Sequence, residues 1–86
     1  MKELRRFQLN RLEDETGVSG TGIIAAGVQF TSGRCVLEWQ TQHTSITMFQ
    51  DKDEMMKVHG HGGKTVLEWI DSEPKTKVAV LIVDNL

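Results

Sequence analysis

The sequence lacks paired cysteines, long apolar runs and an excess of positive charge, and each absence excludes a class of protein. Cys35 is the only cysteine, so a disulfide within the chain and a zinc site built on several thiolates are both excluded. No stretch approaches the roughly 18 apolar residues of a membrane helix, and the first residues contain no apolar run of signal-peptide length. We therefore expect an unprocessed cytoplasmic protein with no membrane partner.

The charges argue against binding to long nucleic acids. Lys and Arg number 10 against 12 Asp and Glu, which gives a formal net charge of −2. Arg5, Arg6 and Arg11 form the one local cluster of basic residues, and such a cluster can face a small anion or simply lie on a solvated strand face. A small anionic molecule is therefore a more plausible ligand than a polynucleotide.

The apolar pattern predicts a single small domain, residues 1–86. Apolar and polar residues alternate in four segments, which indicates four strands. These segments are residues 7–9, 24–30, 35–39 and 46–48. A fifth strand is expected at 66–70, and the continuous apolar run at 78–83 fits a buried sixth strand. The expected fold class is α+β: a small antiparallel β-meander sheet of five to six strands with one short helix.

The period of the pattern changes after residue 50, where the helix is expected. Asp51 and Glu54 have the spacing of a capping box, and Met55, Met56 and Val58 supply an apolar stripe. Gly60 is placed to end the helix in the left-handed conformation.

The small size of the chain favours self-association. A domain of this length buries only about 60–65% of the surface that its unfolded chain exposes. A partner copy could cover the apolar run at 78–83 or an exposed strand edge. We therefore expect a homodimer or a higher homo-oligomer.

The sequence contains an internal repeat of seven residues. Gly33-Arg34-Cys35-Val36-Leu37-Glu38-Trp39 and Gly63-Lys64-Thr65-Val66-Leu67-Glu68-Trp69 both read glycine, cation, any residue, Val-Leu-Glu-Trp. Two matching strands, each preceded by a glycine turn, are the simplest interpretation. Cys35, Leu37 and Trp39 are expected on one face of the third strand, and Ile24, Ala26, Val28 and Phe30 on one face of the second. Either Trp can belong to the core or offer a stacking face to a ligand.

Six of the eight glycines lie in two short blocks, 17–22 and 59–63, and the second block also contains two of the three histidines. Glycine is favoured where the backbone needs a positive φ or where its N–H groups must approach a ligand. Hydroxyls at Ser19 and Thr21 and imidazoles at His59 and His61 accompany these glycines. The blocks therefore predict either a polar, anion-binding pocket or plain turns.

The known catalytic and cofactor motifs are not matched. The first glycine block has neither the spacing of a dinucleotide fingerprint nor the Lys of a Walker loop. His59 and His61 are two residues apart, unlike the helical pairs that bind zinc, and His43-Thr44-Ser45 has no second phosphoesterase motif to accompany it. We therefore expect no metal, no cofactor and no catalytic activity.

Four ordered blocks of the sequence carry a family resemblance: Gly17-Val18-Ser19-Gly20-Thr21-Gly22, Gly27-Val28-Gln29-Phe30, Val36-Leu37-Glu38-Trp39 and Val58-His59-Gly60-His61-Gly62-Gly63. From about Arg6 to Asp71 the chain resembles a group of small proteins encoded by phages, prophages and bacteria. Some phage proteins of this size act as sponges for the cyclic nucleotide signals of bacterial anti-phage defence. The resemblance implies an anti-defence protein that binds such a nucleotide in the host cytoplasm without cleaving it.

A sponge needs donors for phosphates and an apolar or π-face for the bases. Arg5, Arg6, Arg11 and Lys64 could supply charge, and Trp39 or Trp69 the face. The residues expected to bind the ligand are Arg11, Ser19, Gly20, Thr21, Gly22, Trp39, His43, Ser45, His59, His61 and Gly62. Two other functions remain open: a phage structural or protein-interaction module, in which the glycines form turns, and a small phosphodiester hydrolase.

Overall fold

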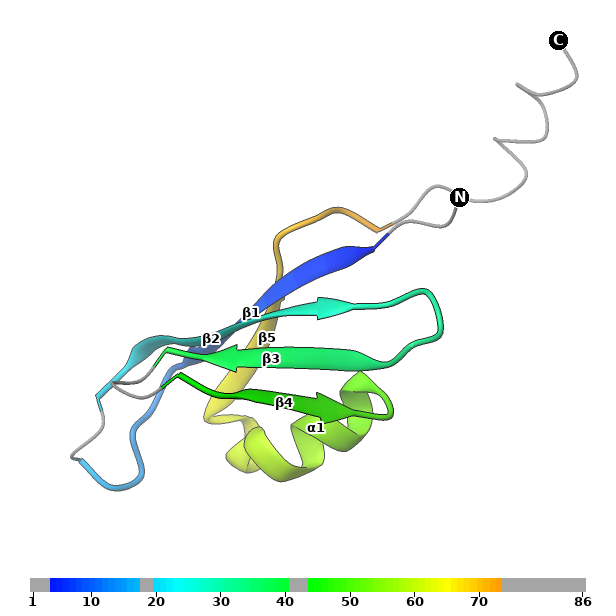
Figure 1. Ribbon diagram of the computed structural model, residues 1–86. Coiled ribbons are helices and arrows are strands. Elements are labelled where there is room, and N and C mark those ends of the chain that lie inside the picture. Colours follow the sequence, from blue (N-terminus) through cyan, green and yellow to red (C-terminus); the bar gives the residue numbers. More distant parts are fainter. Residues whose placement is uncertain (1–3, 18–19, 41–43, 74–86) are drawn as a thin grey trace, which may run out of the picture.

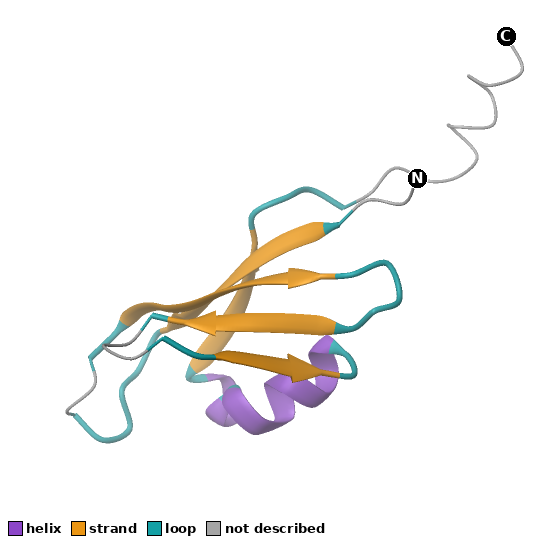
Figure 2. Cartoon of the chain, viewed as in Figure 1, coloured by secondary structure: helices purple, strands orange, loops and turns teal. Residues whose placement is uncertain are grey.

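The computed structural model describes residues 4–17, 20–40 and 44–73, which form an antiparallel sheet with one helix against it (Figures 1 and 2). The strands are β1 (Arg5–Arg11), β2 (Gly22–Gln29), β3 (Cys35–Trp39), β4 (Ile46–Phe49) and β5 (Thr65–Trp69). Their order in the sheet is β4-β3-β2-β1-β5. The predicted α+β meander is confirmed, with β5 returning beside β1 after the helix. The expected strand at 78–83 lies outside the described residues.

Helix α1 (Lys52–His59) begins as its capping box predicts. The carboxylate of Asp51 accepts a hydrogen bond from Glu54 N at 2.7 Å, and Gln50 N donates to the Glu54 carboxylate at 3.2 Å. Met55 is fully buried, but Val58 is 58% exposed. The expected apolar stripe therefore does not include Val58, which α1 turns away from the sheet.

The end of the helix differs from the prediction. Gly60 has right-handed angles, φ −74° and ψ −24°, and its N–H donates to Met56 O at 2.8 Å. A Cβ at Gly60 would lie 2.5 Å from that same oxygen, so glycine is needed here for close approach and not for a positive φ. The left-handed residues are the next three, in the single-turn helix η1 (His61–Gly63).

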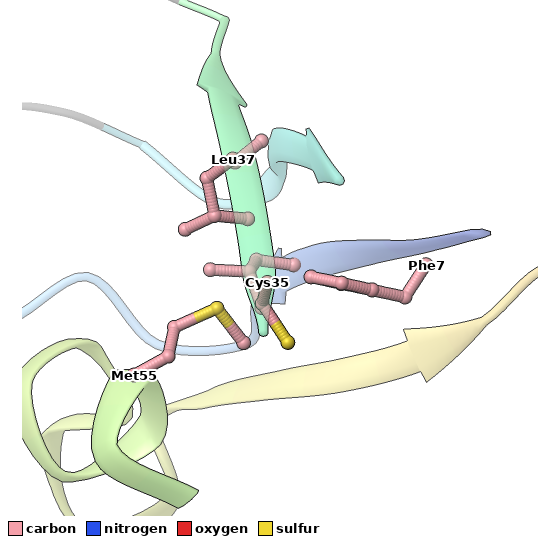
Figure 3. Packing of buried hydrophobic residues seen from close by; sticks show 6 residues of the cluster. Phe7, Cys35, Leu37 and Met55 are labelled. Carbon is pink, nitrogen blue, oxygen red and sulfur yellow. The ribbon is translucent and has the colours of Figure 1, made fainter. Parts of the chain in front are cut away.

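The core lies between α1 and one face of the sheet. Its buried members come from β1, β2, β3 and the helix, and Figure 3 shows Met55 reaching from α1 toward Cys35 on β3. They are Phe7, Leu9, Ala25, Cys35, Leu37 and Met55. The prediction that Cys35, Leu37 and Trp39 share a face is confirmed, because Trp39 packs against the same cluster.

The face prediction for β2 is wrong in part. Ala25 and Gly27 lie on the core face, opposite Leu9 and Phe7, so Ala26 and Val28 point to the face without a helix. The register between β1 and β2 shifts beside Leu9, and this bulge lets Ile24 pack against the core. Phe30 follows the strand and is 43% exposed.

The internal repeat corresponds to two strands in equivalent places. β3 pairs with β2 and β5 pairs with β1, so the two strands flank the central pair on opposite sides. Leu37 lies opposite Gly27, and Leu67 opposite Leu9. Gly33 and Gly63 precede the strands with similar φ values of 94° and 96°. Because β3 and β5 run antiparallel, their glycine turns lie at opposite ends of the sheet.

We expect Gly27→Ala to destabilise the fold by about 1–3 kcal/mol, as overpacking of a core does. A Cβ at Gly27 would lie 2.6 Å from the Phe7 ring and 2.5 Å from Val36 O, and neither the ring nor the strand can move without disturbing the core. Urea denaturation measures the change. The control is Ala26→Val on the uncovered face, and an equal effect of the two substitutions would contradict this account of Gly27.

We expect the carboxyl group of Asp71 to titrate far below its ordinary value. Its oxygens accept hydrogen bonds from the Arg6 guanidinium and from Arg6 N, both at 2.8 Å. These bonds lower its pKa from 3.8 to about 2. The stabilisation that they give is therefore complete above about pH 4 and is lost as the pH falls from there toward 2. Carboxyl NMR titration should find the midpoint near 2 and Arg6→Gln should return it toward 3.8; a wild-type midpoint near 3.8 would refute the bond.

Candidate functional site

The described residues predicted to bind a ligand gather at one end of the sheet, where β1 and β3 finish and β2, β4 and β5 begin (Figure 1). We call this the glycine-rich end. It includes Arg11 at the end of β1, Gly22 at the start of β2, Trp39 at the end of β3 and Ser45 just before β4. Of the predicted site residues, Ser19 and His43 lie outside the described residues.

The segments next to the two glycine blocks are hydrogen-bonded to each other, although the blocks lie more than 30 residues apart in the sequence. The carbonyl of Lys64 accepts from Leu12 N at 2.7 Å and from Glu13 N at 3.2 Å. Arg11 pairs with Gly22 on one side and with Thr65 on the other. The loop that follows β1 is therefore attached to the turn that precedes β5.

Asp14 holds the first glycine block in shape. Its carboxylate accepts hydrogen bonds from Gly20 N at 2.6 Å, and from the N–H and hydroxyl of Thr16 at 3.1 and 2.9 Å. The bond from Gly20 N is the main reason that the pKa of Asp14 is lowered. Arg11 adds a bond from its guanidinium to Gly20 O at 3.2 Å. The Gly20 N–H, a predicted ligand donor, is thus already used by a carboxylate of the chain itself.

Glu15, two residues before the first block, makes electrostatic contacts with the second block and with the residue that follows it. One carboxylate oxygen lies 3.3 Å from Lys64 Nζ, and the other lies 3.6 Å from Nδ1 of His61. All three side chains are between 37% and 48% exposed. Water can reach this Glu15 cluster, defined as Glu15, His61 and Lys64, so its ion pairs contribute little to stability. Both partners of Glu15 are therefore also within reach of a ligand.

The backbone of the second block gives His61 its position. His61, Gly62 and Gly63 have φ values of 49°, 64° and 96°. His61 is the one non-glycine residue with a positive φ in the described parts of the chain. Such a conformation costs a non-glycine residue free energy and is concentrated at functional sites. This left-handed run turns the chain from α1 into β5 and brings the His61 ring beside Glu15.

His59 has a different environment from His61. Its ring lies 4.8 Å from the Trp39 ring and 5.4 Å from the Phe49 ring, centre to centre, with both pairs edge to face. Burial, and to a lesser extent the neighbouring His61, lowers its pKa. The Trp39 ring also donates from Nε1 to the Thr47 hydroxyl at 3.1 Å. His59 and Trp39, both predicted ligand residues, are therefore packed into the edge of the core.

Other predicted residues are divided between the two ends of the sheet. Thr21 and Ser45 are exposed at the glycine-rich end. Trp69 lies at the opposite end, where the Arg5 guanidinium covers its ring at 3.7 Å. Arg6, also at that end, is paired with Asp71. Arg5, Arg6 and Trp69 are therefore separated from the site that the glycine blocks form.

Sequence reasoning missed both acidic residues that organise this end. Asp14 could have been found, because an Asp shortly before a glycine-rich turn often accepts bonds from its backbone. Glu15 carries no such signal, since its partners come from the other block. Across residues 4–17, 20–40 and 44–73, no three His, Cys, Asp or Glu side chains are grouped so as to hold a metal ion. Within the same ranges, no helix has the length and apolar character needed to cross a membrane.

Residues 4–71 match the family described as Acb5 phage protein. The chain belongs to this family. The matched residues contain both glycine blocks and all five described strands, so the glycine-rich end lies within the part shared with the Acb5 family. The expected membership of a phage protein family is confirmed. No curated protein and no solved structure matches the chain.

We expect the two histidines of this Acb5 family member to respond differently to substitution. His59→Ala should cost about 1–2 kcal/mol of stability through its lost ring contacts, whereas His61→Ala should leave stability nearly unchanged. Because the pKa of His59 is lowered on folding, wild-type stability should also decrease as the pH falls below about 6.5. Urea denaturation at several pH values tests both statements. Equal losses for the two variants would contradict the distinction.

Proposed function

We propose that this Acb5 family member counters bacterial defence by binding and sequestering a cyclic nucleotide signal at its glycine-rich end, in the cytoplasm of the host. Names of the Acb series denote anti-CBASS proteins, which fits an opponent of cyclic nucleotide signalling. The proposal makes the protein a homo-oligomeric binding protein and not an enzyme. It needs a site for an anionic phosphodiester beside a surface for a base.

The Glu15 cluster is the observation that carries the proposal. Lys64 and His61 converge on one carboxylate and remain partly exposed. A phosphate oxygen is an acceptor of similar geometry and charge, so it can replace Glu15 as the partner of both side chains. Glu15 holds the two donors together when no ligand is bound, which reduces the entropy lost when a phosphodiester is bound.

Neighbouring residues would complete recognition of a nucleotide. Thr21 presents an exposed hydroxyl one residue after the loop that Asp14 organises. Leu12 and Ile23, next to this loop, are 56% and 42% exposed. Apolar side chains of this kind suit contact with a nucleobase better than the rings of Trp39 and His59, which already contact each other.

Phosphodiester hydrolysis is a second candidate function, and the position of Glu15 favours it. In hydrolytic sites a carboxylate next to one ring nitrogen of His orients the ring, so that the other nitrogen can accept a proton from water. Glu15 lies beside Nδ1 of His61. Nε2 would then take a proton from water, and the water oxygen would bond to phosphorus. One ester P–O bond would break with its electron pair going to the leaving oxygen, which would take a proton from solvent. Lys64 would stabilise the negative charge that develops.

Lys64→Ala tests the site, and the internal repeat supplies a matched control. Loss of a charge-assisted bond to phosphate should weaken binding on the order of tenfold to a hundredfold. Arg34 is the equivalent cation at the opposite end of the sheet, so Arg34→Ala should bind as the wild type does. Isothermal titration with a panel of cyclic di- and trinucleotides measures both variants. Equal affinity of Lys64→Ala and the wild type would exclude the Glu15 cluster as the phosphate site.

Chromatography of the nucleotide recovered after binding distinguishes the two candidate functions. Intact cyclic nucleotide recovered from denatured protein supports sequestration. A linear product, formed by the wild type and not by His61→Ala, supports hydrolysis. If the wild type neither binds nor cleaves any nucleotide of the panel, both proposals fail and a phage protein-interaction module becomes the better account.

A further inference from the structure

A groove of about 510 Å³ runs between α1 and β5, at the edge of the described sheet. Its walls are largely apolar, with Met56 from the helix and Leu67 and Trp69 from the strand. Val66, on the other face of β5, also lines it, so the groove follows the outer edge of the strand. This groove lies apart from the Glu15 cluster, although Gly62 and Gly63 border its end.

The outer edge of β5 presents backbone groups to this groove. Ile70 N donates to Arg6 O and Leu12 N donates to Lys64 O, so residues 64, 66, 68 and 70 direct their backbone groups toward β1. In an antiparallel ladder the alternate residues point the other way. Leu67 and Trp69 therefore direct their N–H and C=O groups away from β1 and toward the groove. A second strand could pair with these groups.

Thr65 supplies a second indication that the groove lacks part of its lining. This residue is 1% exposed, and its hydroxyl has no hydrogen-bond partner among the described residues. Buried hydroxyls are nearly always bonded, because an unpaired one costs free energy. Thr65 lines the groove at the end farther from Trp69. A segment that enters the groove can bring the missing partner.

We propose that residues 78–83 of the same chain lie in this groove as a sixth strand, antiparallel to β5. The run Val-Ala-Val-Leu-Ile-Val is apolar at every position, so the side chains that enter the groove are apolar under either register. Asp71, near the end of the described chain, is bound to Arg6 beside the Trp69 end of β5. Residues 70–77, with Pro74 among them, are long enough for the turn that an antiparallel return requires.

The length of the run at 78–83 also matches the length of β5. Six residues in extended conformation span about 20 Å, and β5 has five residues. A strand that starts beside Trp69 therefore reaches the Thr65 end of the groove at about residue 83. Asp84 and Asn85 follow there, and their side chains can bond to the orphan hydroxyl of Thr65. A second copy of β5 would cover the edge as well, but the apolar run at 78–83 would then have no apolar surface to pack against.

Hydrogen exchange of individual amides in the full chain tests the proposal. The Leu67 and Trp69 N–H groups should exchange slowly in the wild type, at a rate independent of protein concentration. Val80→Asp with Leu81→Asp should accelerate both by at least about tenfold, because adjacent residues point to opposite faces of a strand and one of the two must enter the groove under either register. The Val66 and Glu68 amides, which face β1, serve as internal references. Thr76→Asp, before the run, is the control for added charge.

Three results would overturn the proposal. Fast exchange of Leu67 and Trp69 in the wild type would mean that the edge is open. Slow exchange that Val80→Asp with Leu81→Asp does not change would assign the edge to another occupant, and a dimer in light scattering would identify that occupant as a second copy. A dimer that the double substitution dissociates would mean that the segment docks on the partner copy and not on its own chain. None of these results depends on nucleotide binding.

Discussion

The contact between Phe7 and Gly27 is the constraint on which the rest of the sheet depends. The two residues are cross-strand partners in the central β1–β2 pair, and the Phe7 ring occupies the space that a side chain at position 27 would fill. Leu9 and Ala25, two residues away, repeat this pairing of large with small. Within this central pair, the large core side chains thus come from β1 and the small ones from β2. This arrangement keeps the core thin enough for a single eight-residue helix to cover it.

The repeat around the central pair explains why the candidate binding residues gather at one end. β3 and β5 have matching sequences and matching places, but their glycine turns lie at opposite ends of the sheet. The turn at Gly33 is a tight hairpin between neighbouring strands. The turn at Gly63 instead receives the end of a helix and the loop that follows β1. Lys64 therefore has acidic and imidazole neighbours, whereas Arg34 bonds to Gln50.

Local pattern was enough to predict the strands and the helix start, because alternation and the Asp51 cap are properties of adjacent residues. Prediction of the faces failed in β2 and at Val58. The bulge in β2 separates Ile24 from Ala26 and Val28, and both this bulge and the exposed position of Val58 on α1 depend on packing against distant residues. The glycine blocks were identified as a candidate site from composition. Their contact through Lys64 O and Glu15 was not predictable, because it requires β5 to return beside β1.

The acidic residues at the glycine-rich end determine what kind of ligand it can hold. Asp14 and Glu15 already supply carboxylate acceptors to Gly20 N, Lys64 and His61, so an incoming anion must compete with the chain's own charge. Asp14 accepts hydrogen bonds from three donors, so displacing it would open the first glycine block. Glu15 has only two ionic contacts, both partly exposed, so it can move at little cost in free energy. In the function that we propose, a phosphodiester would therefore replace Glu15 while Asp14 keeps the loop in place. This difference between adjacent carboxylates is the reason that the proposal centres recognition on His61 and Lys64.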